Sequence, residues 1–572
     1  MRTRIMMSSI AVWLAALSHP VQAQPVETIA SLAVVKPVQS CAGLAQLDLS
    51  QIGGAGSKVT SAEETRSGGI PVCSVNLTLA PAIHTQVLLP TEGWTQRYLQ
   101  VGCGGLCGNI TLRSGASNGC QVLTDGGFVM AATDMGHSAR EMEWGLDEQR
   151  RVDFAYRAQH LTALAAKALI ASFYGQAEKF SYFNGCSDGG REALVEAQRY
   201  PEDFDGIVAG APATLFQVQN TLYHGWLAVS NTAKDGSTIL TSDRLPLVHK
   251  AVVEACDALD GVKDGLISEP AKCNFDIATI TCKEGQKDTS TCLTTAESAV
   301  VRKIYEGPKD EKTGLPLTAG QPQPGSELNW QGVFVADERR GHFMSQMIAT
   351  PVLQTIAFSK ADPRFELNDL QFTRETLDAL RARHPLFDAT STDLKAFEKA
   401  GGKLILWHGL ADQHISPANT LSYHKALIDF MGDQSVHGFE RLYLLPGTAH
   451  CGGGEGPSNL DLLTPMMAWV ENGHAPDGIM TTSTGARSDF GQPELPAKGK
   501  GDAGPPPQKK LDYPPLPAMT RPVYPYPYVA AYSGKGDVND GANWQKGNAG
   551  EIVKLRDWPG ADLFSPFKPA ER

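Results

Sequence analysis

A serine set between two glycines, in Gly185-Cys186-Ser187-Asp188-Gly189, is the first group in the chain whose setting indicates chemistry. The aromatic-rich run 180–185 before it predicts a buried strand, and helical spacing follows from Arg191. Strand, G-x-S-x-G and helix form a nucleophile elbow, in which a tight, strained turn lifts the serine hydroxyl over the sheet edge. The helix N-terminus adds partial positive charge where an oxyanion would form. A plain Gly-rich turn is the alternative.

Two residues far along the chain could serve this serine as base and orienting carboxylate. Asp412 follows a strand predicted within 402–412, and His450 follows a strand predicted over 441–446. Because parallel strands end at one edge of a sheet, both side chains should lie near Ser187. His450 would accept the serine proton, and Asp412 would hold the other ring nitrogen and stabilise the imidazolium.

Two other histidines are rival bases. His408 lies within the predicted strand end, which favours a satisfied or substrate-facing histidine, and His414 is expected to open a helix. We therefore prefer His450.

Cysteines adjoin both the serine and the preferred base. Cys186 precedes Ser187, and Cys451 follows His450. If the three catalytic side chains meet, the two sulfurs can bond and would close a loop of about 265 residues, worth about 5 kcal/mol. Two unrelated buried thiols are the alternative.

The elements around these residues predict an α/β fold. Strands are expected at 85–89, 97–101, 127–133 and 204–212, with an amphipathic helix over 153–174. Strand, helix, strand, helix, strand is the pattern of a doubly wound parallel sheet.

A glycine-rich loop, Gly102–Gly108, directly follows the strand at 97–101. This is the place where such folds keep the second oxyanion-hole N–H, although a flexible surface loop is the alternative. Cys103, Cys107 and Cys120 crowd this region, and their pairing stays open.

The α/β pattern breaks between Ala213 and Lys399 and then resumes. The segment is too long for a structureless loop, so we expect an inserted domain that overhangs the active site as a lid. The expected division is 1–23 signal peptide, 24–212 first part of the core, 213–399 lid, and 400–572 second part of the core with a C-terminal wrap. Within the last part, 499–525 is rich in Pro and Gly and is expected to be a linker.

The N-terminus and the cysteine content predict an oxidising compartment. Arg2 and Arg4 precede an apolar run over 5–17, and Val21-Gln22-Ala23 offers a cleavage site, as in a secretory signal. The chain has 11 cysteines, and Cys41 and Cys73 are expected to close a polar, Gly-rich segment. A net charge of −12 argues against nucleic acid and anionic membranes as partners. We expect a secreted or periplasmic protein, a monomer or a homodimer.

The combined motifs resemble those of the tannase and feruloyl esterase family, which includes a mono(2-hydroxyethyl) terephthalate hydrolase. The likeness spans nearly the whole mature chain and lies in Gly185–Arg191, Tyr200–Pro212, His408–Asp412, Pro446–Cys451 and Ala468–Glu471. It implies an α/β-hydrolase core with a lid and a serine esterase that hydrolyses esters of aromatic acids. By analogy, the N–H groups of Gly105 and Asp188 would form the oxyanion hole, and His408 would line the substrate pocket.

The resemblance also implies a structural calcium ion in the lid and no organic cofactor. Three carboxylates, of Asp257, Asp260 and Asp264, lie within ten residues, and the carbonyls of Val262 and Leu266 would complete the oxygen shell. An acidic surface turn is the alternative. Lid disulfides are expected between Cys256 and Cys273 and between Cys282 and Cys292.

The expected function is hydrolysis of hydroxybenzoic or hydroxycinnamic esters through a Ser187 acyl-enzyme. Hydrolysis of a terephthalate or phthalate monoester is the alternative within the enzyme class. A catalytically silent, calcium-stabilised secreted binding protein is the alternative of another class.

Overall fold

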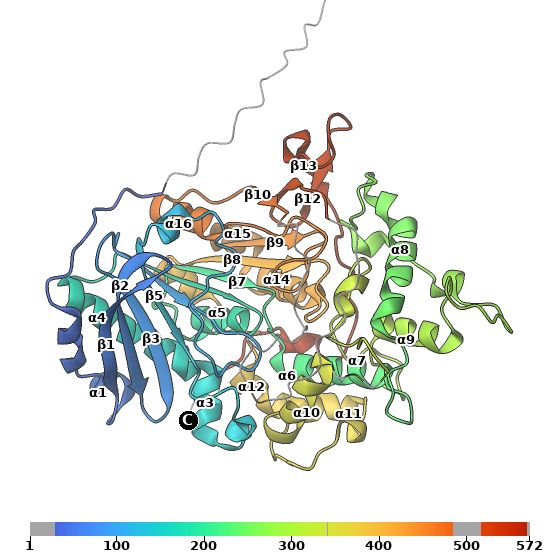
Figure 1. Cartoon of the computed structure of the whole chain (residues 1–572), viewed down its shortest axis with the longest axis horizontal. Helices are drawn as coiled ribbons and strands as arrows, with labels where there is room; N and C mark the ends of the chain where they lie inside the picture. The colour runs from blue at the N-terminus through green and yellow to red at the C-terminus, as the bar shows by residue number, and fades with distance from the viewer. Residues whose placement is uncertain (1–28, 340, 342, 484–515, 569–572) are drawn as a thin grey trace, which may run out of the picture.

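A computed structural model describes residues 29–339, 341, 343–483 and 516–568. At its centre lies a mixed sheet of nine strands, counted over those residues, in the order β1-β2-β3-β5-β4-β6-β7-β8-β9 (Figure 1). The strands are β1 Lys58–Ser67, β2 Ile70–Leu79, β3 Ile83–Pro90, β4 Arg97–Val101, β5 Phe128–Thr133, β6 Phe180–Cys186, β7 Gly206–Gly210, β8 Lys403–Gly409 and β9 Glu440–Leu445. From β5 to β9 neighbouring strands run parallel, which confirms the predicted α/β class.

Helices cover both faces of this sheet. Alternate residues of β8 show the two sides: Leu404 and Leu406 belong to the core cluster that includes residues of α4, α5 and α14, whereas Ile405 and Trp407 belong to the cluster that includes residues of α16. Burial on both faces explains the continuous apolar runs of the parallel strands. The helices are α1 Ser50–Gly53, α2 Gln121–Thr124, α3 Glu148–Val152, α4 Ala158–Tyr174, α5 Asp188–Arg199, α6 Phe216–Val218, α7 His224–Ser230, α8 Leu245–Cys256, α9 Thr295–Glu306, α10 Met344–Thr355, α11 Arg374–Leu380, α12 His384–Phe387, α13 Lys395–Ala400, α14 Pro417–Met431, α15 Asp433–Phe439 and α16 Leu463–Asn472.

The chain between β7 and β8 carries α6 to α13. Figure 1 shows α7 to α11 beside and below the sheet. Buried side chains of α7, α8 and α9 form a hydrophobic cluster of their own, whereas those of α10 and α11 belong to the main core. This arrangement matches an insertion between two core strands. Its role as a lid, and the domain boundaries, stay predictions.

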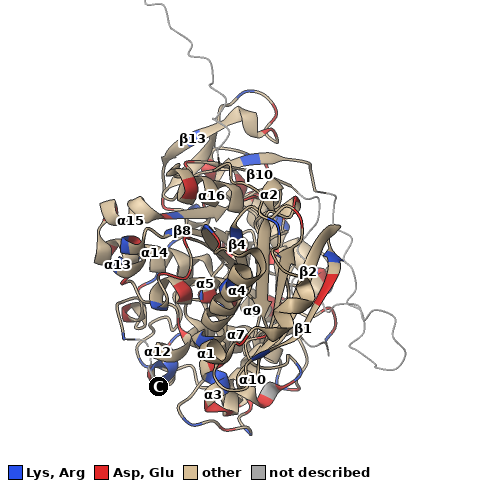
Figure 2. Ribbon diagram, turned by 90° about the vertical axis from the view of Figure 1, so that its left-hand side faces the viewer, with Lys and Arg blue, Asp and Glu red and all other residues tan. Residues whose placement is uncertain are grey.

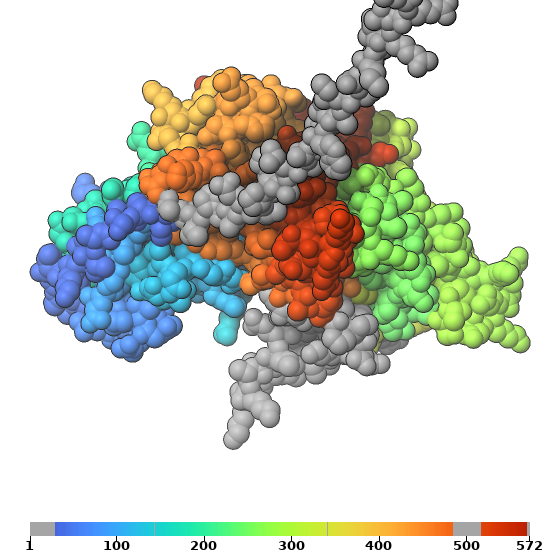
Figure 3. Space-filling model, turned by 90° about the horizontal axis from the view of Figure 1, so that it is seen from above, coloured from blue at the N-terminus to red at the C-terminus, as the bar shows by residue number. Residues whose placement is uncertain are grey.

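The two ends of the described chain extend the fold beyond the predicted elements. The antiparallel pair β1–β2 lies where only a disulfide-closed polar segment was expected. Four C-terminal strands, β10 Ile479–Thr482, β11 Thr520–Val523, β12 Tyr528–Tyr532 and β13 Trp544–Ala549, form two small sheets. Figure 3 shows this segment between the N-terminal half and the insertion. The expected signal peptide and most of the expected linker lie outside the described residues.

Charges of both signs are interspersed over the view in Figure 2, without a face of one sign. Over the described residues, no helix is long and apolar enough to cross a membrane.

Candidate active site

Ser187 sits at a strained turn between β6 and α5. Its backbone has φ 66° and ψ −120°, a conformation that L-residues with side chains rarely adopt. A Cβ on Gly185 would lie 2.2 Å from the carbonyl oxygen of Gly189, so the turn leaves no room for a side chain there. The sharp turn predicted from the two glycines is therefore present, with the serine at its apex.

A continuous hydrogen-bonded chain joins Ser187, His450 and Asp412. His450 Nε2 lies 2.9 Å from Ser187 Oγ, and His450 Nδ1 lies 2.8 Å from Asp412 Oδ2. The backbone of His450 is held as well, because its N–H donates to Gln413 Oε1 at 3.2 Å. The three side chains come from β6–α5 and from the loops after β8 and β9, at one edge of the sheet.

Asp412 is kept ionised by its surroundings. Its Oδ1 accepts the backbone N–H groups of His414 and Ile415, each at 2.8 Å. Burial alone would raise the pKa of Asp412, but the adjacent imidazole of His450 and hydrogen bonds from His450 and His408 outweigh burial and lower the pKa. A fully buried carboxylate is thus available to orient His450 and stabilise its charge.

The expectation that His408 lines the substrate pocket stays a prediction, and the structure shows which groups hold its ring. Its side chain is fully buried, with Nδ1 2.7 Å from Thr420 Oγ1 and Nε2 3.0 Å from the carbonyl oxygen of Ile415. Nε2 also lies 3.1 Å from Asp412 Oδ2, so His408 supports the carboxylate from behind. The sequence could not show this, because the ring direction depends on a helix, α14, that follows later in the chain.

His414, considered above only as a rival base, lines the pocket beside Ser187. Burial, together with the nearby imidazoles of His224 and His450, lowers its pKa. Burial and the charge of His450 likewise lower the pKa of His224 to about 3. Both rings are therefore neutral near pH 7.

The pocket at Ser187 includes Gly105 of the Gly-rich loop and Asp188, the first residue of α5. Both residues proposed to supply oxyanion N–H groups thus lie at the pocket that contains the serine. The other lining residues are Leu106, Ala213, Phe216, Gln219, Asn220, Ile348, His414 and Ile415.

Five disulfides are present among the described residues, and one of them joins the serine turn to the histidine loop. Cys186 and Cys451 are bonded at a sequence separation of 265. The other bonds are Cys41–Cys73, Cys103–Cys107, Cys256–Cys273 and Cys282–Cys292. Cys120, whose pairing stayed open, is a free buried thiol.

The acidic loop 257–266 follows α8 and contains the three aspartates expected to bind calcium. Burial raises the pKa of Asp257 and Asp260, and the negative charge of Asp264 adds to the rise. Backbone N–H groups within the loop donate to all three carboxylates. Over the described residues the three carboxylates are not gathered within 4.8 Å of one another, as ligand atoms of a metal cluster would be.

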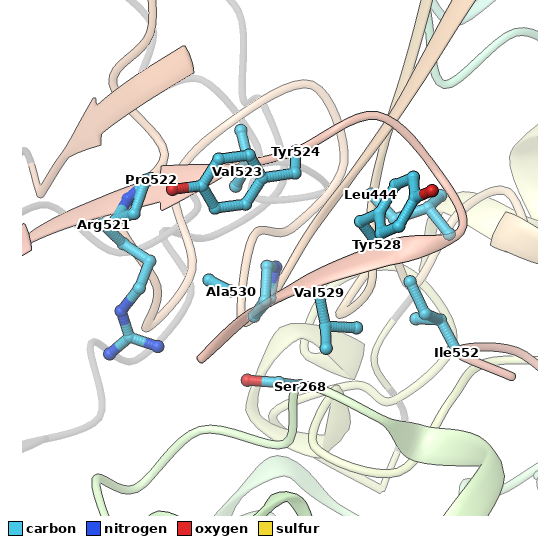
Figure 4. A pocket seen from close by; sticks show the side chains of 11 residues that line it. Ser268, Leu444, Arg521, Pro522, Val523, Tyr524, Tyr528, Val529, Ala530 and Ile552 are labelled. Carbon is cyan, nitrogen blue, oxygen red and sulfur yellow. The ribbon is translucent and has the colours of Figure 1, made fainter. Parts of the chain in front are cut away.

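Arg521 of β11 reaches this loop from the C-terminal segment. Its Nη2 donates to Asp264 Oδ2 at 2.6 Å, and its guanidinium stacks on Trp544. Figure 4 shows the neighbouring pocket, with residues of β11 and β12 on two sides and Ser268 on a third. Arg521 pairs with one of the three carboxylates, and the positive charge of Lys263 in the same loop acts on Asp257. The carboxylates and carbonyls of the loop are the oxygen donors that calcium takes.

A different cluster, of Cys103, Cys107, Asp188 and Glu192, does bring four potential ligand atoms within 4.8 Å of one another. Because the two sulfurs are bonded to each other, they offer no thiolate to a metal. We assign no metal to this cluster.

The chain is similar to known esterases over most of its length. The sequence pattern described as "Tannase and feruloyl esterase" matches residues 67–546. A mono(2-hydroxyethyl) terephthalate hydrolase from Piscinibacter sakaiensis is 32% identical over 528 residues, which cover 81% of each chain. A probable feruloyl esterase from Arthroderma benhamiae is 32% identical over 458 residues, covering 73% of this chain and 80% of that protein. The crystal structure of feruloyl esterase B from Aspergillus oryzae matches with a TM-score of 0.72 and 25% identity, over 89% of this chain and 100% of that one.

Proposed function

Because the chain belongs to the tannase and feruloyl esterase family, we propose that this carboxylic ester hydrolase cleaves esters of aromatic acids through an acyl-enzyme on Ser187. The hydrogen-bonded chain from Ser187 Oγ through His450 to Asp412 is the observation that carries the proposal. A silent binding protein would have no need of a nucleophile aligned with a base and a buried carboxylate.

The mechanism follows from the three side chains. His450 Nε2 takes the proton as Ser187 Oγ attacks the ester carbonyl, and Asp412 stabilises the imidazolium. The N–H groups of Gly105 and Asp188 receive the oxyanion. When the tetrahedral adduct collapses, His450 gives its proton to the leaving alcohol, and Ser187 keeps the acyl group. Water then loses a proton to His450, attacks the acyl carbon, and the acid leaves as Ser187 regains the proton.

The lining of the pocket favours an uncharged acyl group. Phe216 and Ile348 supply apolar surface for a ring, and Gln219, Asn220 and His414 supply polar groups suited to phenolic hydroxyls. The described residues that line the pocket include no Lys or Arg to pair with the free carboxylate of a terephthalate monoester. We therefore favour hydroxybenzoic or hydroxycinnamic esters over that alternative.

The proposal has two further parts: the acidic loop binds a calcium ion, and the protein is exported. Asp257, Asp260 and Asp264, with the carbonyls of Val262 and Leu266, would hold the ion, which would neutralise the loop and stabilise it. The five disulfides support a secreted or periplasmic location, where such bonds persist.

Substitution of the nucleophile tests the proposal. Ser187→Ala should lower turnover of methyl ferulate and methyl gallate by at least about 10³-fold while the melting temperature stays near that of the wild type. Parallel assays with mono(2-hydroxyethyl) terephthalate rank the two substrate classes. Unchanged turnover in folded Ser187→Ala protein would refute the serine mechanism.

A further inference from the structure

The Gly-rich loop that carries Gly105 packs directly on the nucleophile helix. A Cβ on Gly102 would lie 2.6 Å from Gly189 Cα and 2.8 Å from Glu192 Oε2. The loop is closed by the Cys103–Cys107 disulfide, whose cysteines are four positions apart. Because the backbones touch, the position of Gly105 relative to Ser187 depends on what fixes this loop to α5.

Glu192 makes that connection. It lies one helical turn after Asp188 on α5 and is 1% exposed. Its Oε2 accepts the backbone N–H of Cys103 at 3.1 Å and Nε2–H of Gln159 at 2.6 Å. Gln159 Oε1 in turn accepts from Gln100 on β4 at 2.6 Å. One carboxyl group thus links the loop to α5, to α4 and, through Gln159, to the sheet.

The second oxygen of Glu192 faces the disulfide. Oε1 lies 2.8 Å from Cys103 Sγ and 3.4 Å from Cys107 Sγ, and no described N–H group donates to it. Disulfide sulfurs carry no hydrogen and can only accept. The contact is favourable when Oε1 carries a proton and donates it to sulfur, and repulsive when Glu192 is ionised. With no N–H donor at Oε1, this contact favours a neutral carboxyl.

The surrounding charges agree with this. Burial, with the nearby carboxylate of Asp188, raises the pKa of Glu192 to about 8. The charge of Arg191 and the hydrogen bonds from Cys103 N–H and Gln159 oppose this rise. The charged or titratable side chains that face Glu192 are on its own helix, namely Asp188, Arg191 and Glu196. From α4 and the loop, the described groups against it are uncharged.

We propose that Glu192 is a positioning residue that, as a neutral carboxyl, holds the Cys103–Cys107 loop and the N–H of Gly105 over Ser187. The proposal rests on the serine mechanism above. When Glu192 ionises, it loses its hydrogen bond to sulfur. Its negative charge then adds to that of Asp188 near the developing oxyanion. Turnover should therefore decline as the pH rises above about 8, with little effect on substrate binding.

Three variants test this, each assayed for kcat and KM with methyl ferulate from pH 6 to 10. Glu192→Ala should lower kcat about 100-fold with KM nearly unchanged, the loss expected when one oxyanion donor is misplaced. Glu192→Gln, neutral at every pH, should restore kcat at pH 7 and remove the alkaline decline. Glu196→Gln is the matched control: a buried carboxyl one turn farther along α5, whose replacement should leave the decline in place.

Wild-type kcat in folded Glu192→Ala protein, or an unchanged alkaline decline in Glu192→Gln, would overturn the proposal. If Glu192→Ala does not fold, the comparison of the wild type with Glu192→Gln decides alone. Failure of the serine mechanism would be seen separately, as activity that survives in Ser187→Ala.

Discussion

Removing the Cys186–Cys451 bond should destabilise the protein more than removing any short-range disulfide. The bond closes a loop of 265 residues, for which the chain-entropy relation gives about 5.5 kcal/mol at 25 °C. The Cys282–Cys292 bond in the insertion closes only 10 residues, worth about 2.7 kcal/mol. The difference of about 3 kcal/mol is a substantial fraction of the free energy of unfolding of a typical domain, which is about 5–15 kcal/mol.

The assay compares two double variants, Cys186→Ser with Cys451→Ser and Cys282→Ser with Cys292→Ser, by urea unfolding and by kcat. The first should lose about twice as much unfolding free energy and should also lose kcat, because the bond joins the residue before Ser187 to the residue after His450. The second should keep kcat. Equal losses of stability, or full kcat in the first variant, would refute the reasoning.

Three further outcomes are expected. Chelation by EDTA should lower the melting temperature, calcium should restore it, and Asp260→Asn should make the protein insensitive to both; equal melting curves with and without calcium would contradict a structural ion. Burial alone would lower the pKa of His249, but hydrogen bonds to Glu327 and Glu455 outweigh burial and raise it to about 10. The folded pKa of His249 lies above the unfolded value of about 6.5, so protonated His249 contributes fully to the free energy of unfolding below pH 6.5, and the contribution is lost as the pH rises through about 10. In urea unfolding, His249→Gln should therefore reduce the fall in the free energy of unfolding between pH 6.5 and 10. Gly185→Ala should abolish activity, because the added Cβ would lie 2.2 Å from a backbone oxygen of the turn; a fully active variant would show that the turn can relax.

The core strands and the meeting of Ser187, Asp412 and His450 could be predicted because each depends on local pattern and simple topology. The apolar runs that became β5 and β8 are buried on both faces, and residues after parallel strands meet at one edge. The pairing of Cys186 with Cys451 followed from adjacency to two residues already placed together.

Other features depend on contacts that no local pattern carries. β1 is mostly exposed and polar, so its strand character comes from pairing with β2 rather than from its own residues. The direction of the His408 ring depends on Thr420 of α14. In the sequence, Glu192 has the pattern of an ordinary polar residue of a helix. Its role depends on its contact with the loop that begins at Gly102, which only the folded structure shows.

A fluorophosphonate probe tests the central claim most directly, because it reacts with a serine only when an aligned base activates it. The account predicts one equivalent of adduct, located by mass spectrometry on the peptide that contains Ser187, and labelling slowed by about 10³-fold in His450→Ala. An active protein that takes up no label, or takes it up on another residue, would contradict it.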